Sequence, residues 1–239
     1  MFHPSGPTFF ELARQALSST KRGYDLLAPK FDFTPFRTPD AILKPIGVYL
    51  HALGNIESAI DLCCGTGAGM QTLAHAGAQR VAGLDFSHGM LEQARQNLSH
   101  VERPPGGWDL IEQDVFEWEE EEAYDMAVCF GALGHILPAD EDDFIRRVAA
   151  ALRPGGHFVF VTSKLPPIYS PTRIAAHGFN AAMHVRNAVL RPHFIMYYLT
   201  FLWPEIGEKL KTHHLQPTVH QLFEGRLKPL LLIDARKLG

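Results

Sequence analysis

The alternation of short apolar runs with helix-like stretches between residues 58 and 163 constrains the fold more than any other feature of this chain. β-rich runs occupy residues 58–63, 80–84, 108–111, 125–130 and 157–162. Helical patterning fills intervening stretches at residues 69–76, 87–98 and 140–152. Strands that alternate with helices predict a parallel sheet with crossover connections. Two further strand-like runs, residues 217–223 and 229–234, lie close enough in sequence to pair as an antiparallel hairpin.

The segments on either side of this core predict two helical caps. Residues 1–55 have helical patterning, with a start signal at Pro39 and Asp40. Residues 163–203 follow the fifth predicted strand and are too long for a plain connector. Because ligands of open α/β sheets bind at the carboxyl ends of the strands, an insertion that leaves the fifth strand there is placed to cap the site. The prediction is one α/β domain over residues 1–239, with a Rossmann-like, seven-stranded, mostly parallel sheet and helices on both of its faces.

Composition excludes several classes of protein. With 46% apolar and 20% charged residues, the chain is typical of a globular domain. Its three cysteines, Cys63, Cys64 and Cys129, form an odd set in apolar runs, which argues against a disulfide framework and favours a reducing, cytoplasmic setting. We find no signal-peptide pattern, no apolar run of about 18 residues, and no set of ligands spaced for a metal.

The distribution of charge is uneven along the chain. No acidic residue occurs in residues 144–204, where the basic residues are Arg146, Arg147, Arg153, Lys164, Arg173, Arg186 and Arg191. This segment is either a solvated basic face, or a region that receives an anionic substrate or touches an anionic membrane surface. The net charge of −4, and the absence of an Asn/Asp-Pro-Pro-Tyr motif after the fourth predicted strand, argue against a nucleic-acid substrate.

A glycine-rich turn follows the first predicted strand. Gly65, Gly67 and Gly69 allow a tight turn and a close approach of the backbone to a ligand, with Thr66 between the first two. Their spacing differs from the G-x-G-x-x-G pattern of dinucleotide binders, which argues against a reductase that uses NAD. S-adenosylmethionine (SAM) carries no phosphate, and Asp61 just before the turn could pair with its ammonium group.

Acidic residues also follow the next two predicted strands. Asp85 could accept hydrogen bonds from both ribose hydroxyls. Asp114 could accept one from the adenine amine, while the N–H of Val115 serves a ring nitrogen. Phe86 and Met90 would supply apolar walls for the purine. Each residue alone is also typical of a turn or a helix cap, so the prediction depends on their order at successive strand ends.

Together these motifs resemble those of the class I SAM-dependent methyltransferases. Residues 61–67, 83–87 and 113–115 are similar to the first three motifs of that family, and the stretches 124–133 and 152–156 to two later ones. Residues 23–32 resemble the Tyr-Asp pattern of the ubiquinone/menaquinone methyltransferase-like branch, in which it forms a lid over SAM. Phe31 stands where that branch usually has a second Tyr. The resemblance implies SAM as cofactor, with Tyr24 and Gly131 among its contacts.

The implied function is methyl transfer to a small lipophilic or anionic acceptor. His135, just past the fourth predicted strand, is the candidate base, although it could equally cap a helix or bind a loop carbonyl. The apolar run at residues 194–203 is either an ordinary buried helix or a wall of the acceptor pocket. The alternative function is an inactive SAM-binding protein that acts in regulation or assembly. Oligomeric state has no signal in the sequence.

Overall fold

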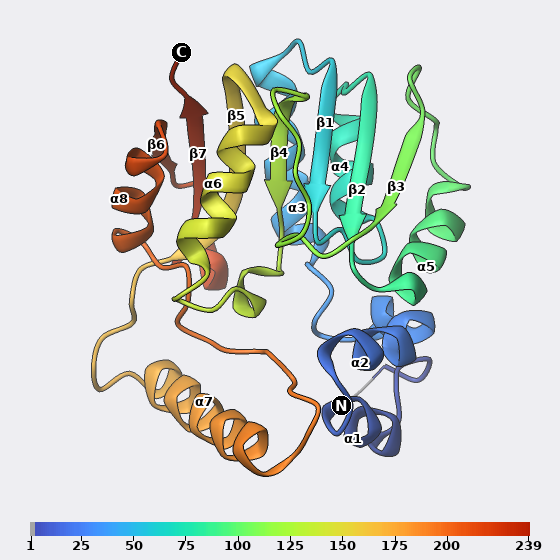
Figure 1. Cartoon of the computed structure of the whole chain (residues 1–239), viewed down its shortest axis with the longest axis vertical. Coiled ribbons are helices and arrows are strands. Elements are labelled where there is room, and N and C mark those ends of the chain that lie inside the picture. Colours follow the sequence, from blue (N-terminus) through green and yellow to red (C-terminus); the bar gives the residue numbers. More distant parts are fainter. Residues whose placement is uncertain (1–2) are drawn as a thin grey trace.

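A seven-stranded sheet organises the computed structural model, which describes residues 3–239 (Figure 1). The strand order is β3-β2-β1-β4-β5-β7-β6. Strands β1 to β5 pair in parallel, β7 runs antiparallel to β5, and β6 runs antiparallel to β7. The strands are β1 Ser58–Leu62, β2 Arg80–Asp85, β3 Trp108–Glu112, β4 Tyr124–Cys129, β5 Leu152–Ser163, β6 Leu215–His220 and β7 Leu230–Lys237. The predicted fold class is confirmed, including the antiparallel hairpin at the C-terminal edge.

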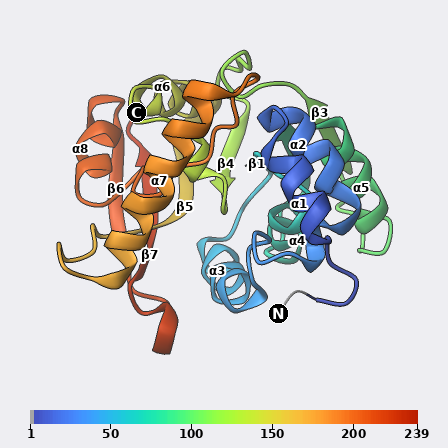
Figure 2. The ribbon, with the colours of Figure 1, turned by 90° about the horizontal axis from the view of Figure 1, so that it is seen from below.

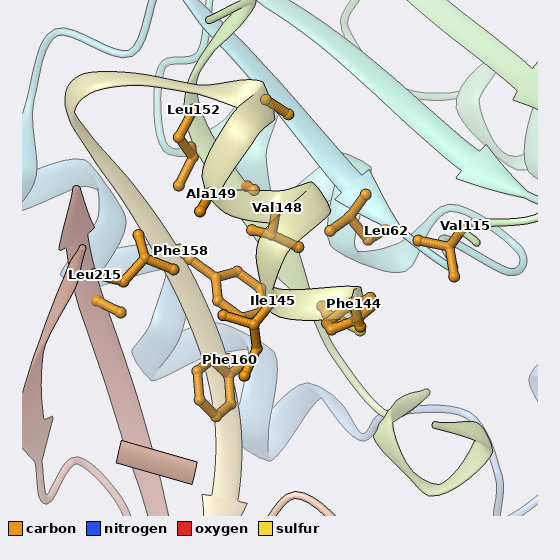
Figure 3. Packing of buried hydrophobic residues seen from close by; sticks show 14 of the residues in the cluster. Leu62, Val115, Phe144, Ile145, Val148, Ala149, Leu152, Phe158, Phe160 and Leu215 are labelled. Atoms are coloured by element: carbon orange, nitrogen blue, oxygen red, sulfur yellow. The ribbon is translucent and has the colours of Figure 1, made fainter. Parts of the chain in front are cut away.

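Helices cover both faces of the sheet, and a separate apolar cluster fills the space on each side. One cluster joins the sheet to α6 (Glu141–Ala151) and α8 (Glu205–Thr212), and Figure 3 shows Phe144 and Ile145 of α6 over Phe158 and Phe160 of β5. The other cluster joins it to α3 (Asp40–Leu53), α4 (Ala68–His75) and α5 (His88–Leu98). Helix α3 therefore packs against the sheet, so that only the part of the predicted lid before it remains free to cover a site.

The remaining helices lie beyond the carboxyl ends of the parallel strands. They are α1 (Phe9–Ala16) and α2 (Thr20–Leu27) near the N-terminus and α7 (Pro171–Val189) in the insertion. Figure 1 places all three below the sheet, and Figure 2 shows α1 and α7 on the same face of the molecule. Arg186 of α7 joins the two groups, because its guanidinium donates to the backbone carbonyls of Ala16 at 3.0 Å and Ser18 at 2.9 Å.

The apolar run at residues 194–203 is not a helix, so that one of its two sequence interpretations is wrong. The chain there is extended and irregular, and Leu199 and Phe201 have positive φ angles of 63° and 55°. Tertiary hydrogen bonds take up the backbone groups of Phe201, whose carbonyl accepts from Thr162 at 2.6 Å and whose N–H donates to Glu141 at 2.8 Å. These bonds replace the local bonds of a helix. In the part of the chain that the structure describes, no helix has the length and apolar character that crossing a bilayer requires.

Candidate functional site

A cavity of about 280 Å³ opens at the carboxyl ends of β1, β2 and β4. It is bounded by the glycine-rich turn, the segment after β4, the N-terminal segment and the insertion. The predicted site residues that line it are Tyr24, Asp61, Gly65, Thr66, Asp85, Phe86, Met90, Gly131 and His135. Phe36 and Thr38, which the sequence did not single out, complete the wall together with Met196 and Tyr198. Met196 and Tyr198 belong to the apolar run 194–203, so part of that run lies in the cavity wall, as its apolar composition indicated.

The glycine-rich turn has the backbone geometry that its composition predicts. Gly65 and Gly67 have φ angles of 53° and 87°, and Gly67 forms the N-cap of α4. A Cβ atom on Gly69 would lie 2.7 Å from the Cγ of Asp61, which is far below a normal contact distance. The first turn of α4 can therefore close over the Asp61 carboxyl only because residue 69 is glycine.

Asp85 connects two turns through one carboxylate. Its Oδ2 accepts from the N–H of Gly65 and its Oδ1 from the N–H of Ser87, both at 2.9 Å. Burial raises the pKa of Asp85 to about 6, and the two N–H groups oppose that rise. The carboxylate is thus fixed at the end of β2 on the cavity wall.

Asp61 is a buried carboxyl group at the end of β1. Its side chain is only 2% exposed, and this burial, with the nearby charge of Asp85, raises the pKa of Asp61 to about 8. A backbone N–H from Met70 works in the opposite direction. A cationic group in the cavity would offset the unfavourable charge of this carboxylate, so that the pair of acids suits a ligand that carries an ammonium group.

Tyr24 and His135 meet across the cavity. The Tyr24 hydroxyl lies 2.7 Å from Nε2 of His135, and the carbonyl of Ile195 accepts from Nδ1 of the same ring. With Nδ1 as donor, Nε2 has a free lone pair that accepts from the tyrosine hydroxyl. Burial lowers the pKa of His135 and raises that of Tyr24, so the structure favours the neutral form of both.

The N-terminal segment is anchored by aspartates next to the cavity. Asp25 accepts from the Ser87 hydroxyl at 2.6 Å and from the Gly89 N–H at 3.0 Å. Asp32 accepts from the Thr66 hydroxyl at 2.6 Å. Both aspartates lie in residues 23–32, which resemble the lid motif. In the structure they hold that segment against the turns after β1 and β2.

Three of the residues predicted to contact the cofactor do not line the cavity: Asp114, Val115 and Gly67. Asp114 is exposed, and its carboxylate accepts from the Phe116 N–H at 3.0 Å, as in an ordinary turn. Val115 is buried in the apolar cluster under α6, and Gly67 shapes the turn from behind. Contact of Asp114 and Val115 with an adenine ring stays a prediction.

The arginines of the basic segment, residues 144–204, do not line the cavity. Arg146 and Arg147 pair with Asp143, and Arg153 pairs with Asp125. Arg173 donates to the Pro166 carbonyl, and Arg186 to the carbonyls that join α7 to the N-terminal helices. The arginine that does line the cavity is Arg37, which comes from the N-terminal segment.

Comparison with known proteins agrees with this geometry. A family of methyltransferase domains matches residues 59–156. A demethylmenaquinone methyltransferase of Clavibacter sepedonicus is 32% identical over 47% of this chain and 43% of its own length. A ubiquinone biosynthesis O-methyltransferase of Proteus mirabilis is 31% identical over 44% of this chain and 42% of its own length. The chain thus spans less than half of the length of these curated relatives.

The fold is similar to solved structures over nearly the whole chain. The complex of DhpI with S-adenosylhomocysteine (SAH) superposes with a TM-score of 0.66, at 22% identity, over 97% of this chain and 99% of that one. The seven-stranded sheet of this chain, with its antiparallel C-terminal pair, therefore has the same fold as that structure. Residues 59–156 are similar to methyltransferase domains, and just under half of the chain is similar to parts of a menaquinone and a ubiquinone methyltransferase.

Proposed function

We propose that this protein transfers the methyl group of SAM to an ionisable hydroxyl group of a small, largely apolar acceptor. The observation that carries the proposal is the Tyr24–His135 pair, which offers a proton acceptor inside a cavity that also holds the cofactor residues. Phe31, Phe36 and Met196 give the same cavity apolar walls. One of its relatives is named as an O-methyltransferase of ubiquinone biosynthesis, which is consistent with a hydroxyl acceptor.

The residues of the cavity fit SAM in charge and in shape. Asp61 would pair with the ammonium group and Asp85 would accept from the ribose hydroxyls, and Gly69 lets the Asp61 carboxyl lie against the first turn of α4. Phe86 and Met90 would contact the purine. When bound, SAM supplies a methyl group on a positively charged sulfur, from which an aligned nucleophile can displace it.

The protein's own contribution is alignment and the removal of a proton. Holding donor and acceptor in line can supply roughly 7–11 kcal/mol of the barrier. An acceptor hydroxyl near Tyr24 would donate to the tyrosine oxygen, while the Tyr24 proton passes to Nε2 of His135. The hydrogen bond from Nδ1 to the Ile195 carbonyl keeps the ring in the tautomer that can accept this proton. The alternative of an inactive SAM-binding module gains no support from a cavity that retains this pair.

Two measurements test the proposal. Calorimetry with SAM, SAH and NAD should show binding of the first two, and a ligand at 100 times its Kd should add about 2.7 kcal/mol of stability. Radiolabelled methyl transfer should then be followed over phenols, catechols, amines and carbon acids of similar size. Binding of NAD without SAM would overturn the cofactor, and transfer only to amines or carbon would overturn the hydroxyl acceptor.

A further inference from the structure

Helix α7 presents an apolar face to solvent, while two asparagines on its other side bind the protein. Ile174, Val185 and Val189 are 61%, 65% and 75% exposed. With Gly178, Ala181 and Ala182, which are also exposed, they follow the spacing of three and four residues that places side chains on one side of a helix. Surface helices of globular proteins normally have the opposite arrangement.

The inward face of α7 explains this inversion. Asn180 donates to the Tyr198 carbonyl and accepts from the Tyr198 N–H, both at 2.8 Å. Asn187 makes the same pair of bonds with Phe194, at 2.9 and 3.0 Å. The side of the helix that carries Asn180 and Asn187 therefore binds the extended segment that walls the cavity. The opposite, apolar side then faces outward.

A second group of exposed apolar side chains belongs to α1 and to the residues just before α7. Phe9 and Phe10 of α1 are 75% and 82% exposed, whereas Gln15 of that helix is buried. Tyr169, just before α7, is 88% exposed. Figure 2 shows α1 and α7 together on the face seen from below, with the ends of the parallel strands behind them. Two separated helices with outward apolar side chains can touch one broad, flat partner at the same time.

The charge of the insertion indicates which kind of partner this face would bind. Lys164 and Arg191 are exposed basic residues on either side of α7, and the insertion contains no acidic residue. In a symmetric dimer through α7 these like charges would face each other, which is unfavourable. An anionic lipid surface provides the opposite charge, and its interface accepts apolar and tyrosine side chains.

We infer that the face formed by α1 and α7 docks on an anionic phospholipid bilayer, with the apolar side chains of both helices inserted at the interface. The segment that α7 supports walls the cavity through Met196 and Tyr198. Docking would therefore bring the acceptor cavity close to molecules dissolved in the membrane. The inference depends on the surface of the protein and not on the proposed methyl transfer.

Vesicle co-sedimentation tests this inference. The full chain should bind vesicles of phosphatidylcholine with phosphatidylglycerol, bind vesicles of phosphatidylcholine alone far more weakly, and lose binding as salt rises. The double variant Ile174→Ser/Val185→Ser should lower the partition coefficient roughly tenfold, because inserted methyl and methylene groups are lost. Val48→Ser is the matched control, since Val48 is 73% exposed but lies on α3.

Thermal unfolding of each variant verifies that the fold is intact, and because it requires no ligand, this test is separate from that of the proposed function. Absence of binding to anionic vesicles would overturn the inference. So would equal binding by the wild type and the double variant. A dimer in light scattering that the double variant dissociates would assign the face to a second copy of the chain instead.

Discussion

The hydroxyl oxygen of Tyr24 lies 2.7 Å from Nε2 of His135, although 111 positions separate the two residues in the chain. The ring of Tyr24 also lies edge-on to Phe86 and parallel to Phe194, so that each part of the cavity wall contributes to its position. One hydrogen bond thus joins the N-terminal segment to the loop after β4. This bond holds the N-terminal segment beside His135.

Removal of either member of this pair should slow turnover without loss of the cofactor. We expect His135→Ala and Tyr24→Phe each to lower kcat by about 10²–10⁴-fold, the usual contribution of a general base. SAM affinity should change little in His135→Ala. Steady-state kinetics and calorimetry measure the two quantities. Acidic phenols, which ionise without help, should regain most of the lost rate, and a loss of equal size on such acceptors would contradict the proton-transfer role.

The pH profile should report the protonation of His135. Burial lowers the pKa of His135 from its ordinary value of 6.5, so the neutral form that accepts a proton persists below that pH. Activity on a neutral hydroxyl should therefore be constant near pH 7 and fall as the pH drops through the lowered value. The measurement is kcat against pH, with His135→Ala as control. A fall that the alanine variant retains would point to another group.

Binding of SAM should release a proton from Asp61. Because its pKa is raised to about 8, the free protein holds a proton there at pH 7, and an ammonium group beside it would favour the ionised form. Calorimetry at pH 7 in buffers with different ionisation enthalpies should detect the release of up to one proton. Asp61→Asn should abolish the release and weaken affinity. An unchanged number of protons in that variant would assign the release elsewhere.

The same shift predicts how the stability of the ligand-free protein varies with pH. The folded state holds the Asp61 proton more tightly than the unfolded chain, whose carboxyl has a pKa of about 3.9. The unfolded state therefore binds fewer protons between about pH 4 and 8, and the free energy of unfolding falls as pH rises through that window. Urea titrations across this range measure the slope, which should be smaller in Asp61→Asn. An equal slope in both proteins would mean that Asp61 is ionised in the fold.

Substitution of two helical glycines by alanine should affect two different properties, the affinity for SAM at residue 69 and the stability of α7 at residue 178. Gly69→Ala would place a methyl group against the Asp61 carboxyl, which should open the turn and weaken SAM binding by tenfold or more. Gly178→Ala meets no neighbouring atom within 4 Å and should stabilise α7 by roughly 0.5–1 kcal/mol, because glycine disfavours helix interiors. Thermal unfolding and SAH calorimetry measure both effects. Normal SAH affinity in Gly69→Ala would show that the close approach is unimportant.

Arg186 should hold the insertion against the N-terminal helices. Arg186→Gln removes bonds to the carbonyls of Ala16 and Ser18, so hydrogen exchange should quicken on both sides of that contact while the sheet is unaffected. Arg191→Gln, an exposed change in the same segment, is the matched control. If exchange near Ser18 is the same in both variants, the contact does not fix the cap.

Local signals were sufficient for the core of the fold and for part of the cavity. The alternation of apolar and helical segments predicts parallel strands, because parallel neighbours need a crossover connection that a helix usually supplies. The glycine-rich turn and the acids at the ends of β1 and β2 lie in short, continuous segments. For that reason Asp61, Gly65 and Asp85 could be named in advance, and all three line the cavity. Residues 163–203 were recognisable as an insertion by length alone.

What the sequence by itself determined is thus the set of strands, their parallel direction and the turn that opens the cavity, since these depend on contacts between near neighbours. Tertiary structure alone decided the rest. It put Asp114 in an exposed turn, kept residues 194–203 extended through bonds to Thr162 and Glu141, and turned the apolar side of α7 outward. It also brought Tyr24 to His135. Each of these outcomes depends on contacts with residues distant in the chain, which the spacing of residues in the sequence does not predict.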